Sequence, residues 1–107
     1  MGDSGVSVRL IALYHQPPDP QAFEQAYFGT HLPLIAKVPG LQSTVVSRFT
    51  RTIMGDGFYM MAEMTFPDEA TLKAAMRSPQ MGEAGVNLAT FAEGLVTLMF
   101  AEEEPPG

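Results

Sequence analysis

The stretches VSVRLIALYH (residues 6–15) and FYMMAEMTF (residues 58–66) decide the fold, because both are apolar on each of their alternating faces. Successive side chains of a β-strand point to opposite faces of its sheet, so such strands have to be covered on both sides. A chain of 107 residues is too short to supply both covers by itself. The sequence therefore predicts that a second molecule covers one face of the sheet.

Composition limits the class of protein. The length fits one domain, which we expect to span residues 6–101, with flexible termini at 1–5 and 102–107. Twelve acidic and six basic residues give a formal net charge of −6, and the basic residues are scattered. Nucleic acid and anionic membranes are therefore not expected as partners, because both select basic patches.

Several classes of site and location are also excluded. The chain has no cysteine, which excludes disulfides, thiolate metal sites and cysteine nucleophiles. It has no signal-peptide pattern and no apolar run of about 18 residues or more, so we expect a soluble cytoplasmic protein.

The first half of the chain predicts a strand, a helix and a second strand. Val6 to Tyr14 reads as a strand, and Asp19 is a suitable N-cap for a helix that begins at Pro20. Phe23, Tyr27 and His31 recur every fourth residue and share one stripe of that helix. Pro33 disfavours helical geometry at Leu32, so the helix should stop or be re-nucleated there. Residues 41–53 then read as the second strand.

The second half predicts a hairpin, two helices and a last strand. The Asp56-Gly57 pair between two strand-like runs predicts a hairpin, which makes the strands on either side antiparallel neighbours. Pro67-Asp68-Glu69 begins a helix, and Ser78-Pro79 ends it and caps a third one. The third helix ends at Gly94, and the final strand, LVTLMFA, follows it.

The order strand, helix, strand, strand, helix pair, strand predicts an α+β fold of the ferredoxin-like βαββαβ type with a four-stranded antiparallel sheet. Right-handed crossovers place both helical connections on one face of the sheet. The face expected beneath the helices is formed by Val8, Leu10, Ala12 and Tyr14 of the first strand and by Phe58, Met60, Ala62, Met64 and Phe66 of the third. The other face, which includes Tyr59, Met61 and Glu63 of one strand and Arg9 of another, is left uncovered. Two copies packed face to face would cover it, so we expect a homodimer.

The chain resembles the EthD family of the dimeric α/β barrel superfamily. The resemblance lies in the segment DPQAFEQAYFGTHLPLIAKVPGL (19 to 41), with His-x-Pro-Leu from His31 to Leu34 and Pro-Gly-Leu at its end. It continues at Ala62-Glu63-Met64 and Phe66, although Thr65 stands where many members carry an aromatic residue. It covers roughly residues 6 to 101. The resemblance implies a homodimer whose two sheets enclose a barrel, with a ligand cleft in each subunit between sheet and helices or inside the barrel.

His31 is the candidate catalytic residue. A histidine at a helix end beside a cleft titrates near neutrality and acts as a general acid or base, for example on a proton next to a carbonyl. The structural alternative is that its imidazole caps the helix or satisfies a buried carbonyl while the ring packs on Tyr27. His15 is expected to be a solvated residue at the rim of the sheet.

The candidate ligand-binding residues are Tyr27, Tyr59, Met61, Glu63 and Arg9. Either tyrosine can donate a hydrogen bond to a ligand oxygen, although an aromatic stripe also suits a core. Met61 suits an adaptable apolar cavity or ordinary packing. Arg9 and Glu63 are expected to pair inside the barrel, as a structural ion pair or as groups that position a polar part of the ligand.

No metal site and no cofactor are expected, because two histidines sixteen residues apart without a carboxylate at ligand spacing match no metal pattern. The leading hypothesis is a homodimer that binds a small apolar carbonyl or aromatic compound and performs cofactor-free proton transfer or oxygenation. The alternative is a non-catalytic dimeric ligand-binding or accessory protein of a degradation pathway. A haem-binding enzyme with His31 as axial ligand is a third hypothesis.

Overall fold

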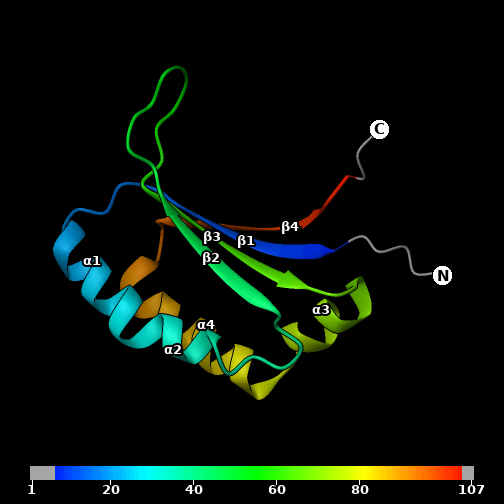
Figure 1. The fold of residues 1–107 in the computed structure, drawn as a ribbon. Coiled ribbons are helices and arrows are strands. Elements are labelled where there is room, and N and C mark those ends of the chain that lie inside the picture. Colours follow the sequence, from blue (N-terminus) through cyan, green and yellow to red (C-terminus); the bar gives the residue numbers. More distant parts are fainter. Residues whose placement is uncertain (1–6, 105–107) are drawn as a thin grey trace.

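The computed structural model describes residues 7–104 of the chain (Figure 1). Of the termini that we expected to be flexible, residues 1–5 and 105–107 lie outside the described residues, as does Val6 of the first predicted strand. The elements in chain order are β1 (Val8–Tyr14), α1 (Pro20–Ala26), the π-helical turn η1 (Tyr27–His31), α2 (Leu32–Ile35), β2 (Ser43–Arg48), β3 (Met60–Phe66), α3 (Glu69–Met76), α4 (Pro79–Ala92) and β4 (Val96–Glu102).

The four strands form one antiparallel sheet in the order β2-β3-β1-β4. β1 and β3 are the central strands, and Ala12 of β1 lies opposite Ala62 of β3 and Leu98 of β4. The fold is therefore α+β and ferredoxin-like, and the predicted βαββαβ order is confirmed. Within one chain the sheet is open, because its edges are formed by different strands, β2 and β4.

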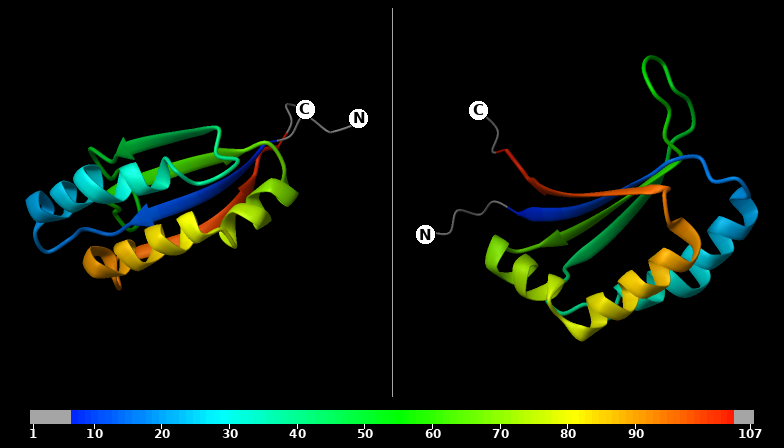
Figure 2. Two further views of the ribbon diagram at one scale, coloured as in Figure 1. Left: turned by 90° about the horizontal axis from the view of Figure 1, so that it is seen from below. Right: turned by 180° about the vertical axis from the view of Figure 1, so that it is seen from behind.

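All helices lie on one face of the sheet (Figures 1 and 2). Burial alternates residue by residue along β1 and β3, because only one of the two faces is covered. The buried set beneath the helices is Val8, Leu10, Ala12 and Tyr14 of β1 with Met60, Ala62, Met64 and Phe66 of β3. This is the face that the sequence predicted, except that the ring of Phe58, which precedes β3, is only partly buried.

The helix after β1 continues past the predicted break at Pro33. Asp19 caps its first turn by accepting a hydrogen bond from the backbone N–H of Ala22 (3.1 Å). The chain then passes through the π turn, where the N–H of Leu32 donates to the carbonyl of Tyr27, and enters α2 with Leu32 in helical geometry. Of the two predicted outcomes, re-nucleation is the one observed. Pro33 is tolerated because the first turn of a helix does not need its missing N–H.

The connection between β2 and β3 is longer than predicted. The strands are antiparallel neighbours, as expected, but β2 ends at Arg48 and β3 begins at Met60. Residues 49–59 project beyond the end of the sheet (Figure 1). Among the described residues of this loop, only Gly55 has a positive φ (86°). A tight type I′ turn requires positive φ at both of its central residues, so Asp56 and Gly57 do not form one.

The second helical connection agrees with the sequence. Asp68 caps α3 by accepting from the N–H of Thr71, and Ser78 caps α4 by accepting from that of Met81. Gly94 has a φ of 78°, which favours glycine, where the chain turns into β4. β4 extends through Glu102, one residue beyond the expected domain boundary, because Glu102 pairs with Val8. No helix within residues 7–104 is long and apolar enough to cross a membrane.

Candidate functional site

An apolar pocket of about 250 Å³ lies over β1, between the helical layer and the sheet. In the left view of Figure 2, β1 (dark blue) is visible between α1–α2 (blue to cyan) on one side and α4 (yellow to orange) on the other. The residues that line the pocket come from β1, η1, α2 and α4, and also from β3, α3 and β4: Leu10, Ala12, Tyr14, Tyr27, His31, Ile35, Met64, Met76, Met81, Gly82, Ala84, Gly85, Leu88 and Leu98. The pocket thus has apolar walls and three aromatic side chains with polar atoms.

These three side chains form the inner end of the pocket. Tyr14 and Tyr27 are each 1% exposed and His31 is 4% exposed. The ring of Tyr27 lies between the other two, 5.7 Å from the Tyr14 ring and 5.6 Å from the imidazole, centre to centre. Tyr27 and His31 stand at the two ends of the π turn, and π turns occur frequently at functional sites.

His31 has one side-chain partner among the described residues. Its Nδ1 lies 3.1 Å from Oδ1 of Asn87, which comes from the middle of α4. With the amide oxygen as acceptor, Nδ1–H donates the hydrogen bond, so the neutral imidazole keeps a free lone pair on Nε2. Burial lowers the pKa of His31, and the hydrogen bond to Asn87 partly opposes that change. The ring is therefore neutral at pH 7 and has one nitrogen available as a base.

Both tyrosines at the pocket are neutral hydrogen-bond donors. Burial raises the pKa of Tyr27 to about 12. The pKa of Tyr14 is raised further, chiefly by burial and also by the nearby Tyr27. Within residues 7–104 neither hydroxyl has a hydrogen-bond partner, and no fully enclosed polar side-chain atom lacks one. The two hydroxyls therefore reach open space, which is the pocket that both residues line.

Of the predicted site residues, only His31 and Tyr27 line this pocket. Arg9, Met61 and Glu63 lie on the uncovered face of the sheet, as the alternation predicted. The guanidinium of Arg9 is 4.0 Å from the carboxylate of Glu63 and 3.7 Å from that of Glu103. The predicted pairing of Arg9 with Glu63 is thus present, on the face opposite to the pocket.

Tyr59 was expected on the uncovered face, and that expectation is wrong. Its ring packs edge-on against Phe23 of α1 (5.8 Å between centres), so it lies on the helical side. Phe58, expected beneath the helices, instead packs against the exposed ring of His15 at 5.0 Å. The alternation shifts by one residue before Met60, because the N–H of Tyr59 donates to the carbonyl of Tyr14, the residue that also pairs with Met60.

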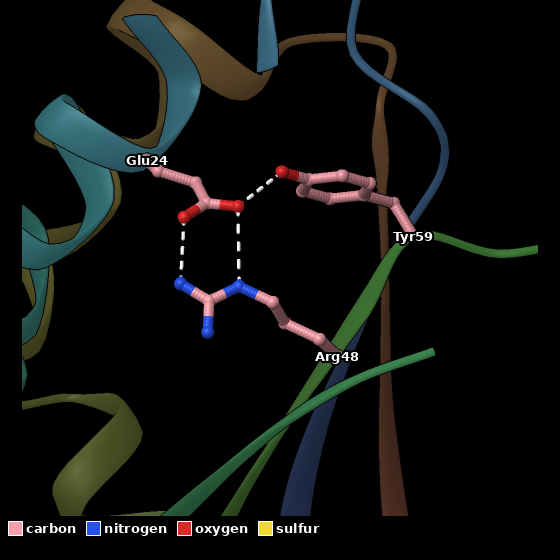
Figure 3. A network of polar contacts seen from close by, with 3 residues as sticks. All are labelled: Glu24, Arg48 and Tyr59. Carbon is pink, nitrogen blue, oxygen red and sulfur yellow. Dashed lines mark hydrogen bonds and ion pairs between the residues drawn. The ribbon is translucent and has the colours of Figure 1, made fainter. Parts of the chain in front are cut away.

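The hydroxyl of Tyr59 is committed to a polar network (Figure 3). It donates a hydrogen bond to Glu24 of α1, and Arg48 at the end of β2 donates two more to the same carboxylate, at 2.6 and 3.2 Å. These bonds, those from Arg48 first, lower the pKa of Glu24. The network ties β2 and the loop to α1, so a structural role accounts for Tyr59.

Sequence reasoning missed two polar residues of the site, Tyr14 and Asn87. Tyr14 was assigned to the covered face of the first strand, and its position at the end of that strand, near the aromatic helix, was the available signal. Asn87 carried no signal, because its partner His31 is 56 residues away in the sequence. Among the described residues, no three His, Asp or Glu side chains gather closely enough to hold a metal ion.

Comparisons with known proteins agree with the resemblance noted in the sequence. Residues 15–94 match the family model of the EthD domain. An uncharacterized 11.0 kDa protein from the thcB-thcC intergenic region of Rhodococcus erythropolis is 31% identical over 98 residues, which cover 90% of this chain and 94% of that protein.

Two solved structures extend the comparison. A crystal structure of an EthD family protein from Bacillus halodurans is 45% identical, with a TM-score of 0.87 over 92% of this chain and 99% of the other. A dimeric protein of unknown function and ferredoxin-like fold from Bacteroides fragilis is 18% identical, with a TM-score of 0.64 over 91% and 96% of the two chains, and shares the fold alone. The family match covers most of the chain and both closer relatives span nearly all of it, so this protein belongs to the EthD family.

Proposed function

We propose that this protein binds a small, mostly apolar molecule with a carbonyl or phenolic oxygen, and that His31 moves a proton on the bound molecule. The observation that carries the proposal is the apolar pocket whose inner end presents two unpartnered phenol hydroxyls and one imidazole. A largely apolar cavity with a few convergent polar groups is the usual form of a small-molecule site.

In this proposal each polar group has a role. Tyr14 and Tyr27 donate hydrogen bonds to the ligand oxygen, where negative charge develops if a neighbouring proton leaves. His31 accepts that proton on Nε2 and returns it either to the same carbon, which exchanges the proton, or to the ligand oxygen, which is a tautomerisation; neither outcome changes the atoms of the molecule. Asn87 holds the imidazole in the required tautomer. In this scheme the apolar walls exclude water and strengthen each interaction.

Pocket size restricts the ligand. A cavity of about 150 Å³ lined by apolar side chains holds one benzene molecule. The pocket here is about 250 Å³, which suits one aromatic ring with substituents or two fused rings. Substituted phenols and aryl ketones are therefore suitable probes.

The binding test compares three tyrosine variants. Para-cresol and acetophenone are titrated by calorimetry into wild type, Tyr14→Phe, Tyr27→Phe and Tyr59→Phe. Loss of either pocket hydroxyl is expected to weaken binding roughly tenfold, about 1.4 kcal/mol, which is within the range for one hydrogen bond. Tyr59→Phe is the matched control, because its hydroxyl is bound to Glu24. The proposal fails if wild type binds no probe, or if all three variants bind as wild type does.

The catalytic part has its own test. Acetophenone is incubated with the protein in heavy water, and deuterium uptake at its methyl group is followed by NMR, alongside oxygen consumption with phenols in air. His31→Gln is expected to abolish enzyme-dependent uptake while it retains binding. Oxygen consumption would instead indicate the oxygenation that we also considered, with dioxygen as the oxidant.

A non-catalytic binding or accessory protein is the second candidate, and one observation favours it. The partner of His31 is the neutral Asn87, and within the described part of the chain no carboxylate lines the pocket to stabilise an imidazolium. Tight probe binding without deuterium uptake or oxygen consumption would select this candidate. No Lys or Arg among the described residues lines the pocket either, so it offers no partner for the carboxylates of haem.

The uncovered face supports a homodimer as part of the proposal. Its apolar side chains are half-buried or exposed within one chain and come from all four strands: Ile11, Leu13, Val45, Met61, Met99 and Ala101. An apolar sheet face of this extent is typical of an interface, and two copies would close the open sheet into a barrel. In this arrangement the pocket lies outside the barrel, on the helical side of each sheet.

A further inference from the structure

Two glycines occupy adjacent turns in the first half of α4. Gly82 and Gly85 lie inside the helix Pro79–Ala92, where each glycine costs roughly 1 kcal/mol of stability relative to alanine. Neither has the positive φ that favours glycine, which in the described chain is found at Gly40, Gly55 and Gly94. Their backbone conformation therefore does not explain them.

Close packing does not explain them either. A Cβ built on Gly82 or Gly85 meets no atom within 4 Å, so alanine would fit at both positions without a clash. Gly40 shows the opposite case, since a Cβ there would lie 2.4 Å from Cγ2 of Thr71. The two helical glycines thus reduce helix stability without a packing reason.

Both glycines line the pocket, at its outer end. They are exposed, as are Met76 and Leu98 of the same lining, whereas Tyr14 and Tyr27 at the inner end are buried. The hydroxyls of these tyrosines have no protein partner among the described residues, which favours a polar ligand atom over an incidental packing defect in the space enclosed by this rim. Because the glycines lie at the mouth of the pocket, they affect whether a ligand can enter it and how wide that ligand can be.

We propose that Gly82 and Gly85 determine the ligand size that the pocket accepts, by keeping its mouth free of side chains on the α4 side. This inference rests on the proposed function and adds the class of ligand: molecules whose outer part is wider than a single ring, such as a fused bicyclic phenol or ketone. A methyl group takes about the volume of a water molecule, so two of them would fill ~60 Å³ at the mouth. The inner end, with its hydroxyls and imidazole, would be unchanged.

The experiment measures stability and size selectivity in the same variants. Gly82→Ala, Gly85→Ala and the double variant are compared with wild type by thermal unfolding and by calorimetric titration with para-cresol and naphthol. We expect the melting temperature to rise in each variant, the affinity for naphthol to fall at least roughly tenfold in the double variant, and the affinity for para-cresol to change less than about twofold. Val86→Ala is the matched control, because Val86 lies on the same helix, is 72% exposed and does not line the pocket.

Each result has one meaning. If wild type binds neither probe, the proposed function fails, and this inference with it. If wild type binds both and the double variant keeps the wild-type ratio of affinities, only the inference is overturned. A fall in melting temperature in the alanine variants would overturn it as well, because the glycines would then serve packing. A higher melting temperature together with a lower affinity for naphthol, but not for para-cresol, supports the inference.

Discussion

The two faces of the sheet are built from the same strands, yet they differ in what they can do. On β1 and β3, every second residue is buried beneath the helices, and the residues between are half-exposed. The covered face contains the pocket with Tyr14 at its inner end, and the uncovered face contains the Arg9–Glu63 pair among apolar side chains. Burial in one chain is therefore enough to form a pocket, whereas the other face would acquire a comparable environment only by association.

The largest expected effect comes from two neighbouring methionines on opposite faces. Met60 is fully buried and does not line the pocket, so Met60→Ala should lower the free energy of unfolding by about 2–5 kcal/mol at any protein concentration. Met61 is half-exposed, so Met61→Ala should cost about 1 kcal/mol or less in dilute protein, and more in concentrated protein if a second copy covers it. Urea denaturation followed by circular dichroism at low and high concentration measures both. Equal costs for the two variants would contradict the distinction between the faces.

A charge in the middle of the uncovered face tests association directly. Leu13→Asp should weaken the homodimer by about a hundredfold or more, roughly 3 kcal/mol, because an unpaired carboxylate would be buried at the interface. Val86→Asp places the same charge on the exposed side of α4 and should leave the assembly unchanged. Sedimentation velocity measures both variants. A wild-type protein that sediments as a monomer at micromolar concentration would rule out the homodimer.

The smallest expected effect is a pH dependence from the covered face. Burial holds the pKa of His31 below its usual 6.5, so the unfolded chain takes up a proton there before the folded chain does. His31 therefore makes its full contribution to the free energy of unfolding above pH 6.5. That contribution is lost as the pH falls toward the pKa of His31 in the folded protein. His31→Gln should remove that part of the slope in denaturation curves recorded at several pH values.

Asn87 sharpens the same test. Its hydrogen bond raises the pKa of His31 against the effect of burial, so Asn87→Leu should move the pKa further down. NMR titration of the imidazole C–H signals measures the change. If His31 titrates above 6.5 in the wild-type protein, its ring is not desolvated. That result would contradict the proposal that a buried, neutral His31 acts as the base.

The sequence predicted the parts of the fold that depend on local patterns. The alternation of Leu10, Ala12 and Tyr14, the caps at Asp19 and Ser78, and the order of elements each follow from neighbours in the chain, and each was confirmed. The length of the β2–β3 loop was wrong, because an Asp-Gly pair specifies a tight turn only when the flanking residues pair up to it.

The candidate site was predicted only in part, for a related reason. The fourfold spacing on one helix predicted that Tyr27 and His31 share a stripe, and both line the pocket. Tyr59 was placed on the wrong face because Tyr59 and Met60 both lie opposite Tyr14, and one extra residue in a strand shifts the alternation. Asn87 could not be found, because its contact with His31 depends on how α4 packs against the π turn, and packing between distant segments has no local signature.

The central position of β1 has a consequence for how this chain folds. Its hydrogen-bonding partners are β3 and β4, and the pairing of Val8 with Glu102 joins the beginning of the described chain to its end. During synthesis β1 emerges before both of its partners, and it lacks the second one until β4 has also been made. Such long-range pairing slows folding, so the apolar side chains of β1 stay exposed until β4 is in place.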